Sequence, residues 1–266
     1  MITCGVDIGS RTVKVVLFDG EKIVASGTIL SGRAPQEKAV LLFNQLLAEL
    51  KCTADDVAKT VATGYGRNFF SQADKISSEI ICHTAGVAFL CPEVKTIIDI
   101  GGQDSKVIQV SSRGKVEDFV MNDRCAAGTG KFIEMVALTL ELTIQQTGPI
   151  SLVGEESCDI SSMCAVFAES EVNGLLHNGT EIDVILRGVF KSVAKRVIAL
   201  GRKLNFESPI VFTGGVAQNQ GVLAAIQAQA NDPSIMIPEH PQLTGALGAA
   251  IMGYKNALKG GVDESR

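Results

Sequence analysis

At 266 residues, the chain is long enough to bury one large core or two lobes that share a cleft. Hydrophobic residues make up 46 % of the sequence and charged residues 20 %, the usual balance of a soluble globular protein. The formal net charge of −5 argues against a nucleic-acid partner, because nucleic-acid-binding proteins carry a basic footprint. The longest weakly polar run, 243–254, is shorter than the ~20 residues of a membrane helix, so no membrane partner is expected.

The N-terminus has no basic region and carries Asp7 in its first apolar segment, so we expect no signal peptide and a cytoplasmic protein. Seven cysteines, an odd number, do not suggest a disulfide framework in such a protein. Five of them lie in or beside apolar segments or have no informative neighbours: Cys4, Cys52, Cys82, Cys91 and Cys158. Cys125 and Cys164 remain as candidates for chemistry.

One ten-residue segment occurs twice, at an offset of 92 residues and without a gap. The first copy, 7–16, reads DIGSRTVKVV, and the second, 99–108, reads DIGGQDSKVI. Each copy predicts an apolar strand that ends in Asp, a glycine-containing turn that can close backbone N–H groups on an anion, and a second apolar strand. The predicted strands are 2–8 and 12–18 in the first copy and 94–100 and 105–110 in the second, each pair followed by a third strand.

Helical spacing of apolar residues predicts a helix that begins at Pro35 and runs to about Leu50, and a longer helix over 186–204. Thr180 with Asp183 is expected to cap the longer helix. A strand from Pro209 enters Gly214-Gly215 and then a helix, a pattern that resembles a nucleotide-handling turn. A last helix over 244–255 begins with small residues that permit tight packing.

The order of two Asp-Gly turns, a Gly-Gly turn and a small-residue helix resembles the actin-like ATPase superfamily, which includes sugar kinases and heat-shock chaperones. This resemblance implies a two-lobed α/β fold with duplicated βββαβα units. Lobe I would span 1–93 and be completed by a C-terminal helix at about 244–258, and lobe II would span 94–240.

The same resemblance implies that the two Asp-Gly turns hold the phosphates of ATP or ADP and that the Gly-Gly turn supports the adenosine. Asp7 and Asp99 would lie near Mg²⁺, a hard cation that prefers oxygen ligands, and Asp104 is a third candidate catalytic carboxylate. The implied nucleotide-binding residues are Ser10, Arg11, Thr12, Val13, Lys14, Gly101, Gly102, Gln103, Gly214, Gly215, Gln218, Gln242 and Gly245.

Cys125 and Cys164 each precede a predicted helix, 131–143 and 165–176 respectively. The positive end of a helix favours the thiolate form that ligates metal, and small neighbours leave room for an inorganic cluster. A pair of buried, inert cysteines fits these positions about as well, whereas zinc is disfavoured because no CxxC pair or His partner has the usual spacing. Since a cubane iron–sulfur cluster takes four thiolates, two cysteines per chain would point to a cluster shared by two chains.

Five stretches resemble the activators of 2-hydroxyacyl-CoA dehydratases, a family that includes the ATPase subunits of benzoyl-CoA reductase: 63–67, 98–104, 121–130, 164–171 and 213–217. The resemblance covers 3 to about 255. It implies a homodimer with one [4Fe–4S] cluster between the subunits, held by Cys125 and Cys164 of each. ATP would drive one low-potential electron, supplied by ferredoxin or flavodoxin, to an iron–sulfur dehydratase or reductase.

The sequence leaves several points open. Arg11 stands where such activators commonly carry a small residue, which leaves the subfamily and the partner enzyme undecided. Glu169 and Glu171 would face either the cluster, a partner or solvent. A small-molecule kinase of the same fold, with Asp104 as base, is one alternative function, and a nucleotide-dependent interaction module with a structural thiol pair is another.

Overall fold

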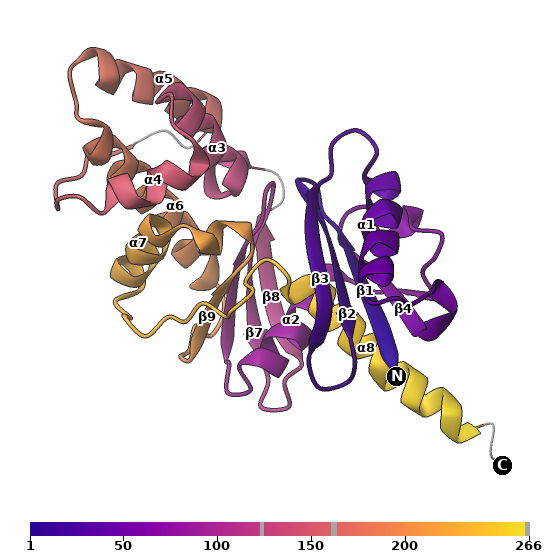
Figure 1. The fold of residues 1–266 in the computed structure, drawn as a ribbon. Coiled ribbons are helices and arrows are strands. Elements are labelled where there is room, and N and C mark those ends of the chain that lie inside the picture. Colours follow the sequence, from indigo (N-terminus) through magenta and orange to yellow (C-terminus); the bar gives the residue numbers. More distant parts are fainter. Residues whose placement is uncertain (123–124, 161–163, 264–266) are drawn as a thin grey trace. The chain divides into compact units, whose positions relative to one another are not determined.

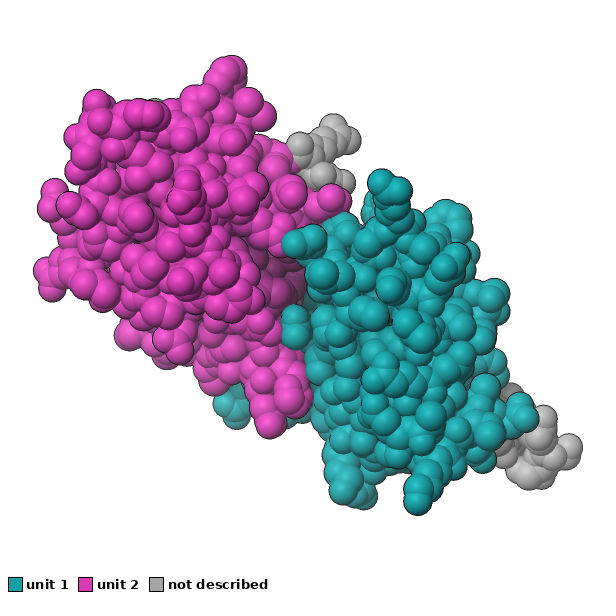
Figure 2. All heavy atoms as spheres, turned by 45° about the horizontal axis from the view of Figure 1, so that its top comes forward, with its two compact units in different colours: residues 1–93, 110–116, 242–266 teal, residues 94–109, 117–241 magenta. Residues whose placement is uncertain are grey.

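The structure is a computed structural model that describes residues 1–122, 125–160 and 164–263 (Figure 1). The chain forms two compact units, coloured separately in Figure 2. Unit 1 comprises Met1–Glu93, Val110–Val116 and Gln242–Arg266, and unit 2 comprises Val94–Gln109 and Glu117–Pro241. Along the described part of the chain, no helix combines the length and apolar character needed to cross a membrane.

Unit 1 is built around a five-stranded sheet with the order β3-β2-β1-β4-β5. The runs of β1 and β2 are almost continuously apolar because both faces of the sheet are covered by helices. Helix α1 packs on one face, and α2 and α8 pack on the other. The elements are β1 (Ile2–Ile8), β2 (Thr12–Phe18), β3 (Ile23–Leu30), α1 (Pro35–Glu49), η1 (Ala54–Asp56), β4 (Val57–Thr63), η2 (Arg67–Phe69), β5 (Lys75–Ile76), α2 (Glu79–Leu90) and α8 (Thr244–Asp263).

The small residues at the start of α8 let this helix approach its neighbours at backbone distance. A Cβ added at Gly248 would lie 1.7 Å from the carbonyl oxygen of Cys82 in α2, and one added at Gly5 would lie 1.9 Å from the carbonyl oxygen of Ala246. The tight packing predicted for this helix is confirmed, although the helix extends beyond residue 255. Its first turn is thereby held firmly at the end of β1, where Asp7 lies.

Unit 2 is built around a four-stranded sheet with the order β8-β7-β6-β9, in which β6 runs antiparallel to β7 and parallel to β9. One apolar core joins this sheet to its helices. The elements are β6 (Thr96–Ile100), β7 (Ser105–Val110), β8 (Val116–Asn122), η3 (Ala126–Gly128), α3 (Gly130–Thr139), α4 (Ile144–Ser151), α5 (Ala165–His177), α6 (Ile182–Gly201), β9 (Ile210–Thr213), η4 (Gly215–Gln218) and α7 (Gln220–Ala230).

Two sequence expectations in unit 2 are wrong. The helix predicted over 131–143 ends at Thr139, because Glu141 adopts a left-handed conformation (φ 56°) and Thr143 caps the separate helix α4. The long helix α6 begins at Ile182 after Glu181, so Thr180 and Asp183 do not form its cap. Asp183 instead forms an ion pair with Arg187 one turn later, at 2.7 Å.

Candidate nucleotide site and cysteine pair

The first Asp-Gly turn lies at the carboxyl end of β1 in unit 1. Asp7 is buried, and its carboxylate accepts a hydrogen bond from Lys14 Nζ at 3.0 Å, across the β1–β2 pair. The turn closes through the Gly9 N–H, which donates to the Thr12 carbonyl at 3.1 Å. Ser31 supports it from β3's end, since its hydroxyl donates to the Gly9 carbonyl at 2.7 Å. The expected phosphate-binding residues Ser10, Arg11, Thr12 and Val13 follow one another through this turn.

The second turn repeats this geometry in unit 2. Lys106 stands opposite Asp99 across β6 and β7, as Lys14 stands opposite Asp7. Its ammonium is only 1 % exposed and contacts two carboxylates, Asp99 at 3.2 Å and Asp104 at 3.0 Å. The turn closes through the Gly101 N–H, which donates to the Asp104 carbonyl at 2.9 Å, with Gly102 and Gln103 at its tip. The internal repeat is therefore a repeat of side-chain contacts as well as of strands.

A third strand extends the repeat beyond what the sequence comparison found. Thr63 at the end of β4 stands beside Asp7, and Thr213 at the end of β9 stands beside Asp99. The next residues, Gly64 (φ 84°) and Gly214 (φ 89°), are left-handed, and a Cβ would lie 2.3 Å and 2.7 Å from Oδ1 of the respective Asp. Only glycine fits there without displacing the carboxylate. The Thr-Gly pair occurs in the sequence at both positions, 63–64 and 213–214. It does not follow the 92-residue offset of the repeat, because additional helices separate β8 from β9 in unit 2.

The carboxylate of Asp7 has an oxygen available to a ligand. Asp7 Oδ1 and the neighbouring Thr63 Oγ1 are buried and have no hydrogen-bond partner within the described residues. Buried oxygens of this kind normally bind ordered water or a cation. Gly245, at the start of α8, faces the other carboxylate oxygen, because a Cβ there would lie 3.3 Å from Asp7 Oδ2. Gln242 precedes this helix and is half-buried. The buried oxygens of Asp7 and Thr63 are of the type that Mg²⁺ or its water ligands prefer.

The Gly-Gly turn lies at the end of β9, in unit 2. Gly214 N–H donates to the Pro241 carbonyl at 2.9 Å, and Gly215–Gln218 form the 3₁₀ turn η4 ahead of the helix that the sequence predicted after the Gly-Gly turn. The α-helix α7 begins only at Gln220, capped by the Asn219 side chain. Gly215, Gly214 and Gln218 are thus grouped in one short turn.

The two candidate cysteines are both in unit 2. Cys125 is half-buried and precedes η3, five residues before the start of α3. The Asn122 side chain brackets it, donating to the Cys125 carbonyl at 2.9 Å and accepting from its N–H at 3.2 Å. Cys164 is exposed and directly precedes α5. Asp123 and Arg124 of the first cysteine motif lie outside the described residues.

The other thiols are poorly suited to act as ligands. Burial raises the pKa of the Cys4 thiol well above the ordinary value, and burial also raises the pKa of the Cys82 thiol. Burial also raises the pKa of the half-buried Cys91 and Cys158 thiols, and Cys158 donates to the Val184 carbonyl. Because metal ligation requires thiolate, these four residues are disfavoured as ligands.

Backbone hydrogen bonds join the second Asp-Gly turn to the segment that follows Cys125. The N–H groups of Gly130 and Lys131, the first two residues of α3, donate to the carbonyls of Gly101 and Gly102, each at 2.9 Å. A Cβ at Gly130 would lie 3.1 Å from the Gly101 oxygen and 3.2 Å from Val216 in the η4 turn. The start of α3 therefore contacts both of the turns in unit 2 that are expected to handle nucleotide.

Residues 4–253 match the model of the BadF/BadG/BcrA/BcrD ATPase family. The chain belongs to this ATPase family. It is 45 % identical to a 2-hydroxyisocaproyl-CoA dehydratase activator from Clostridioides difficile, over 97 % of this chain and 96 % of the relative. It is 42 % identical to the (R)-2-hydroxyglutaryl-CoA dehydratase activating ATPase from Acidaminococcus fermentans, over 97 % of this chain and 98 % of the relative.

Solved structures agree with this membership of the BadF/BadG/BcrA/BcrD family. The activator of the 2-hydroxyisocaproyl-CoA dehydratase from Clostridium difficile, with bound ADPNP, superposes with a TM-score of 0.94 at 43 % identity, covering 99 % of this chain and 98 % of that one. A ROK family glucokinase from Streptomyces griseus superposes with a TM-score of 0.60 at 12 % identity, covering 96 % and 100 %, which shows the fold alone. The predicted actin-like α/β fold and the resemblance to dehydratase activators are confirmed.

Proposed function

We propose that this chain is an ATP-dependent activator that delivers one low-potential electron to a partner iron–sulfur enzyme. The partner would be a 2-hydroxyacyl-CoA dehydratase, a benzoyl-CoA-type reductase or a reductase with a double-cubane cluster. The activator would act as a homodimer with one [4Fe–4S] cluster, held by Cys125 and Cys164 of each subunit. The names of its full-length relatives as dehydratase activators, and its membership of an ATPase family, support this function.

The two Asp-Gly turns are proposed to bind the phosphates of ATP or ADP, with Mg²⁺. Asp7 would bind Mg²⁺ or one of its water ligands through Oδ1, which has no partner in the described residues. Backbone N–H groups and hydroxyls of 10–12 and 101–104 would contact the phosphates. Hydrolysis adds a water oxygen to the γ-phosphorus, breaks its bond to the β-phosphate oxygen, and releases ADP, inorganic phosphate and a proton. Asp99 and Asp104, held by Lys106, would orient that water or accept its proton.

The cysteine chemistry fits a shared iron–sulfur cluster. Cys125 and Cys164 each precede a helical segment, and Cys164 is exposed, so a second chain can reach it. Val166 and Phe167, immediately after it, are 66 % and 68 % exposed, an apolar surface of the kind that a second subunit covers. When bound, a [4Fe–4S] cluster would supply a one-electron redox couple. Each chain's own role is to hold two of the four thiolates and to limit their access to water.

The observation that carries the proposal is the pair of hydrogen bonds from Gly130 and Lys131 to Gly101 and Gly102. A phosphate that contacts the Gly101–Asp104 turn would shift the carbonyls of Gly101 and Gly102. The start of α3 would then shift as well, because its first two N–H groups donate to these carbonyls. The 3₁₀ turn after Cys125 would shift with it, since the Thr129 N–H donates to the Ala126 carbonyl at 3.0 Å. Nucleotide could thus change the surroundings of a thiolate ligand through these three backbone hydrogen bonds.

Iron analysis of the anaerobically purified protein tests the proposal. We expect a brown homodimer with iron approaching about four atoms per dimer, by the four-thiolate rule. Cys125→Ala and Cys164→Ala should each remove the iron, because either change leaves two thiolates per dimer. Cys52→Ala is the matched control and should retain it. Full iron content in Cys164→Ala, or a colourless wild type, would contradict the shared cluster and favour a kinase or an interaction module.

A further inference from the structure

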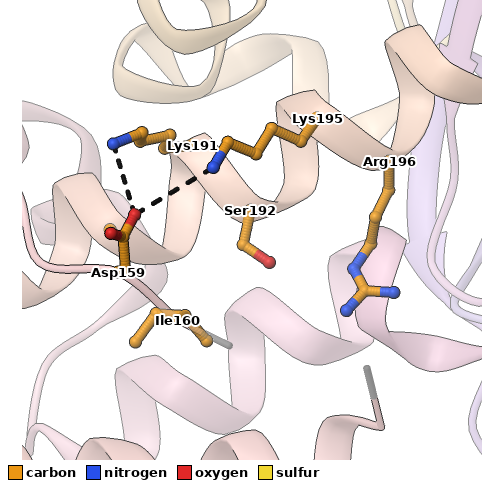
Figure 3. A pocket seen from close by; sticks show the side chains of 7 residues that line it. Asp159, Ile160, Lys191, Ser192, Lys195 and Arg196 are labelled. Atoms are coloured by element: carbon orange, nitrogen blue, oxygen red, sulfur yellow. Dashed lines mark hydrogen bonds and ion pairs between the residues drawn. The ribbon is translucent and has the colours of Figure 1, made fainter. Parts of the chain in front are cut away.

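A pocket in unit 2 lies on α6, outside the turns and the two cysteines (Figure 3). Its volume is about 190 Å³ and its walls include Lys191, Ser192, Lys195 and Arg196 of α6 and residues 159–160 of the segment opposite. Gly188 makes the approach possible, because a Cβ there would lie 2.5 Å from the Cys158 carbonyl oxygen. The close approach at Gly188 therefore places the pocket beside the basic residues of α6.

The pocket carries an excess of positive charge. Lys191 and Lys195 are one helical turn apart and both point to the same carboxylate oxygen of Asp159, at 3.4 Å and 4.0 Å (Figure 3). Asp159 is 81 % exposed, so these ion pairs are weakened by water. Two lysines at this spacing repel each other, and one carboxylate offsets one of them. The remaining positive charge at this pocket is opposite in sign to the formal net charge of the whole chain, which is −5.

The pocket adjoins the turn that follows Cys125. The Cβ and Cδ of Arg196 lie 3.7 Å from where a Cβ on Gly128 would stand, in the η3 turn that follows Cys125. Asp159 and Ile160 stand shortly before Cys164 in the chain. An anionic group held by Lys191 and Lys195 would therefore bring its carrier next to the η3 turn that follows the proposed ligand Cys125.

The size of the pocket selects among anions. Pockets for nucleotides and other drug-sized ligands usually exceed about 300 Å³, so this one suits a single carboxylate or phosphate group. An acidic redox protein would be repelled by most of the surface of an acidic chain, and would be oriented by a local positive site. We infer that this pocket is the docking site for a surface carboxylate of an acidic electron-donor protein. This inference rests on the proposed function, which requires such a donor.

Binding of oxidised flavodoxin, an acidic probe, tests the site without any need for a cluster. Fluorescence anisotropy at low ionic strength should show about tenfold weaker binding for Lys191→Glu/Lys195→Glu. Arg202→Glu/Lys203→Glu carries the same change of charge on exposed residues just after α6 and should bind within about twofold of wild type. Salt should weaken wild-type binding and reduce the difference between the variants.

Reduction kinetics provide the second readout. The anionic hydroquinone of flavodoxin gives up one electron and becomes the neutral semiquinone, while the activator gains the electron. The Lys191→Glu/Lys195→Glu variant should be reduced about tenfold more slowly by flavodoxin and at the wild-type rate by reduced methyl viologen, a small cation that needs no basic site. A colourless protein would lack the iron–sulfur cluster and would refute the proposed function. The flavodoxin-binding test would still decide whether the pocket is a docking site, because binding does not require the cluster.

Unchanged flavodoxin binding in Lys191→Glu/Lys195→Glu would overturn the inference, as would an equal loss in the control pair. Inorganic phosphate distinguishes a small-anion site. If calorimetry detects phosphate binding that the double variant loses while its flavodoxin binding is intact, the pocket serves a free anion and the docking site is refuted. Competition between phosphate and flavodoxin for the wild type would support it.

Discussion

Asp7 and Asp99 occupy equivalent positions but differ in how their lysines are neutralised. Lys14 is 15 % exposed and contacts Asp7, so water can still solvate part of its charge. Lys106 is 1 % exposed and depends on both Asp99 and Asp104. A buried charge that loses a partner is expensive, whereas a partly hydrated one is less affected. The two halves of the repeat should therefore respond differently to the same substitution.

Substitution of each aspartate by asparagine separates nucleotide chemistry from folding. Both Asp7→Asn and Asp99→Asn should lower Mg-ATP hydrolysis by about 100-fold or more, because a carboxylate beside the phosphates is lost. Asp99→Asn should also lower the free energy of unfolding by about 3 kcal/mol, since the buried Lys106 loses the charge of one of its two carboxylate partners. Asp7→Asn should lower the free energy of unfolding by less than Asp99→Asn does, because Lys14 remains partly hydrated. Anaerobic urea unfolding and phosphate release measure the two effects.

The control for this pair is Asp74→Asn, which alters an exposed ion pair with Lys59 in unit 1 and should leave hydrolysis unchanged. All three variants should remain brown, because the cysteines lie on other segments. Normal hydrolysis in either Asp7→Asn or Asp99→Asn would mean that the Asp-Gly turns are ordinary hairpins.

At the scale of elements, the contact between the start of α3 and the Gly101–Asp104 turn should be sensitive to one methyl group. Gly130→Ala places a Cβ 3.1 Å from the Gly101 oxygen and 3.2 Å from Val216, which is tighter than most carbon contacts. The turn and the helix must then separate by a few tenths of an ångström. We expect the effect of nucleotide on the rate of iron chelation to fall at least fivefold, the lower range of allosteric couplings.

Gly128→Ala is the matched control for Gly130→Ala. It adds the same methyl group in the neighbouring η3 turn, where the nearest atoms lie at 3.7 Å, an ordinary contact. Its chelation rates should respond to nucleotide as the wild type does. Equal responses in wild type, Gly128→Ala and Gly130→Ala would exclude the α3 hydrogen bonds as the route of coupling.

The strands and the paired turns could be predicted from sequence because their signals are local. An apolar run that ends in Asp-x-Gly fixes its own strand and turn, and the repeat at 92 residues predicted the same pair of strands in both units. The ion pairs of Lys14 with Asp7 and of Lys106 with Asp99 were not predicted, because Lys14 was expected to contact phosphate. The hydrogen bond of Gly130 with Gly101 could not be predicted, since the glycine-rich run 128–130 contains no local signal for a contact with a turn about 30 residues earlier in the chain. The end of α3 was missed because Glu141, a good helix former, is held in a left-handed turn by tertiary structure.

At the scale of the whole molecule, the proposed cluster requires a second copy of the chain. Phe167→Asp should weaken dimerisation at least tenfold and lower iron content, because it places a carboxylate in the apolar surface beside Cys164. Leu258→Asp, at an exposed apolar position on α8, is the control and should leave both unchanged. Anaerobic sedimentation equilibrium measures the dimer. A Phe167→Asp dimer as stable as wild type, with full iron, would exclude α5 from the interface.

Coupling between ATP state and the cysteine site is the central claim, and it requires that the two nucleotide states stabilise the site differently, since a ligand that binds both equally shifts nothing. The most direct measurement is anaerobic: the reduction potential, and the rate at which bathophenanthroline removes iron, without nucleotide, with ADP and with a non-hydrolysable ATP analogue. We predict that both quantities change with the nucleotide and that ADP and the analogue differ from each other. Three superimposable potentials together with three equal chelation rates would contradict the ATP-driven mechanism, even if both sites bind their ligands.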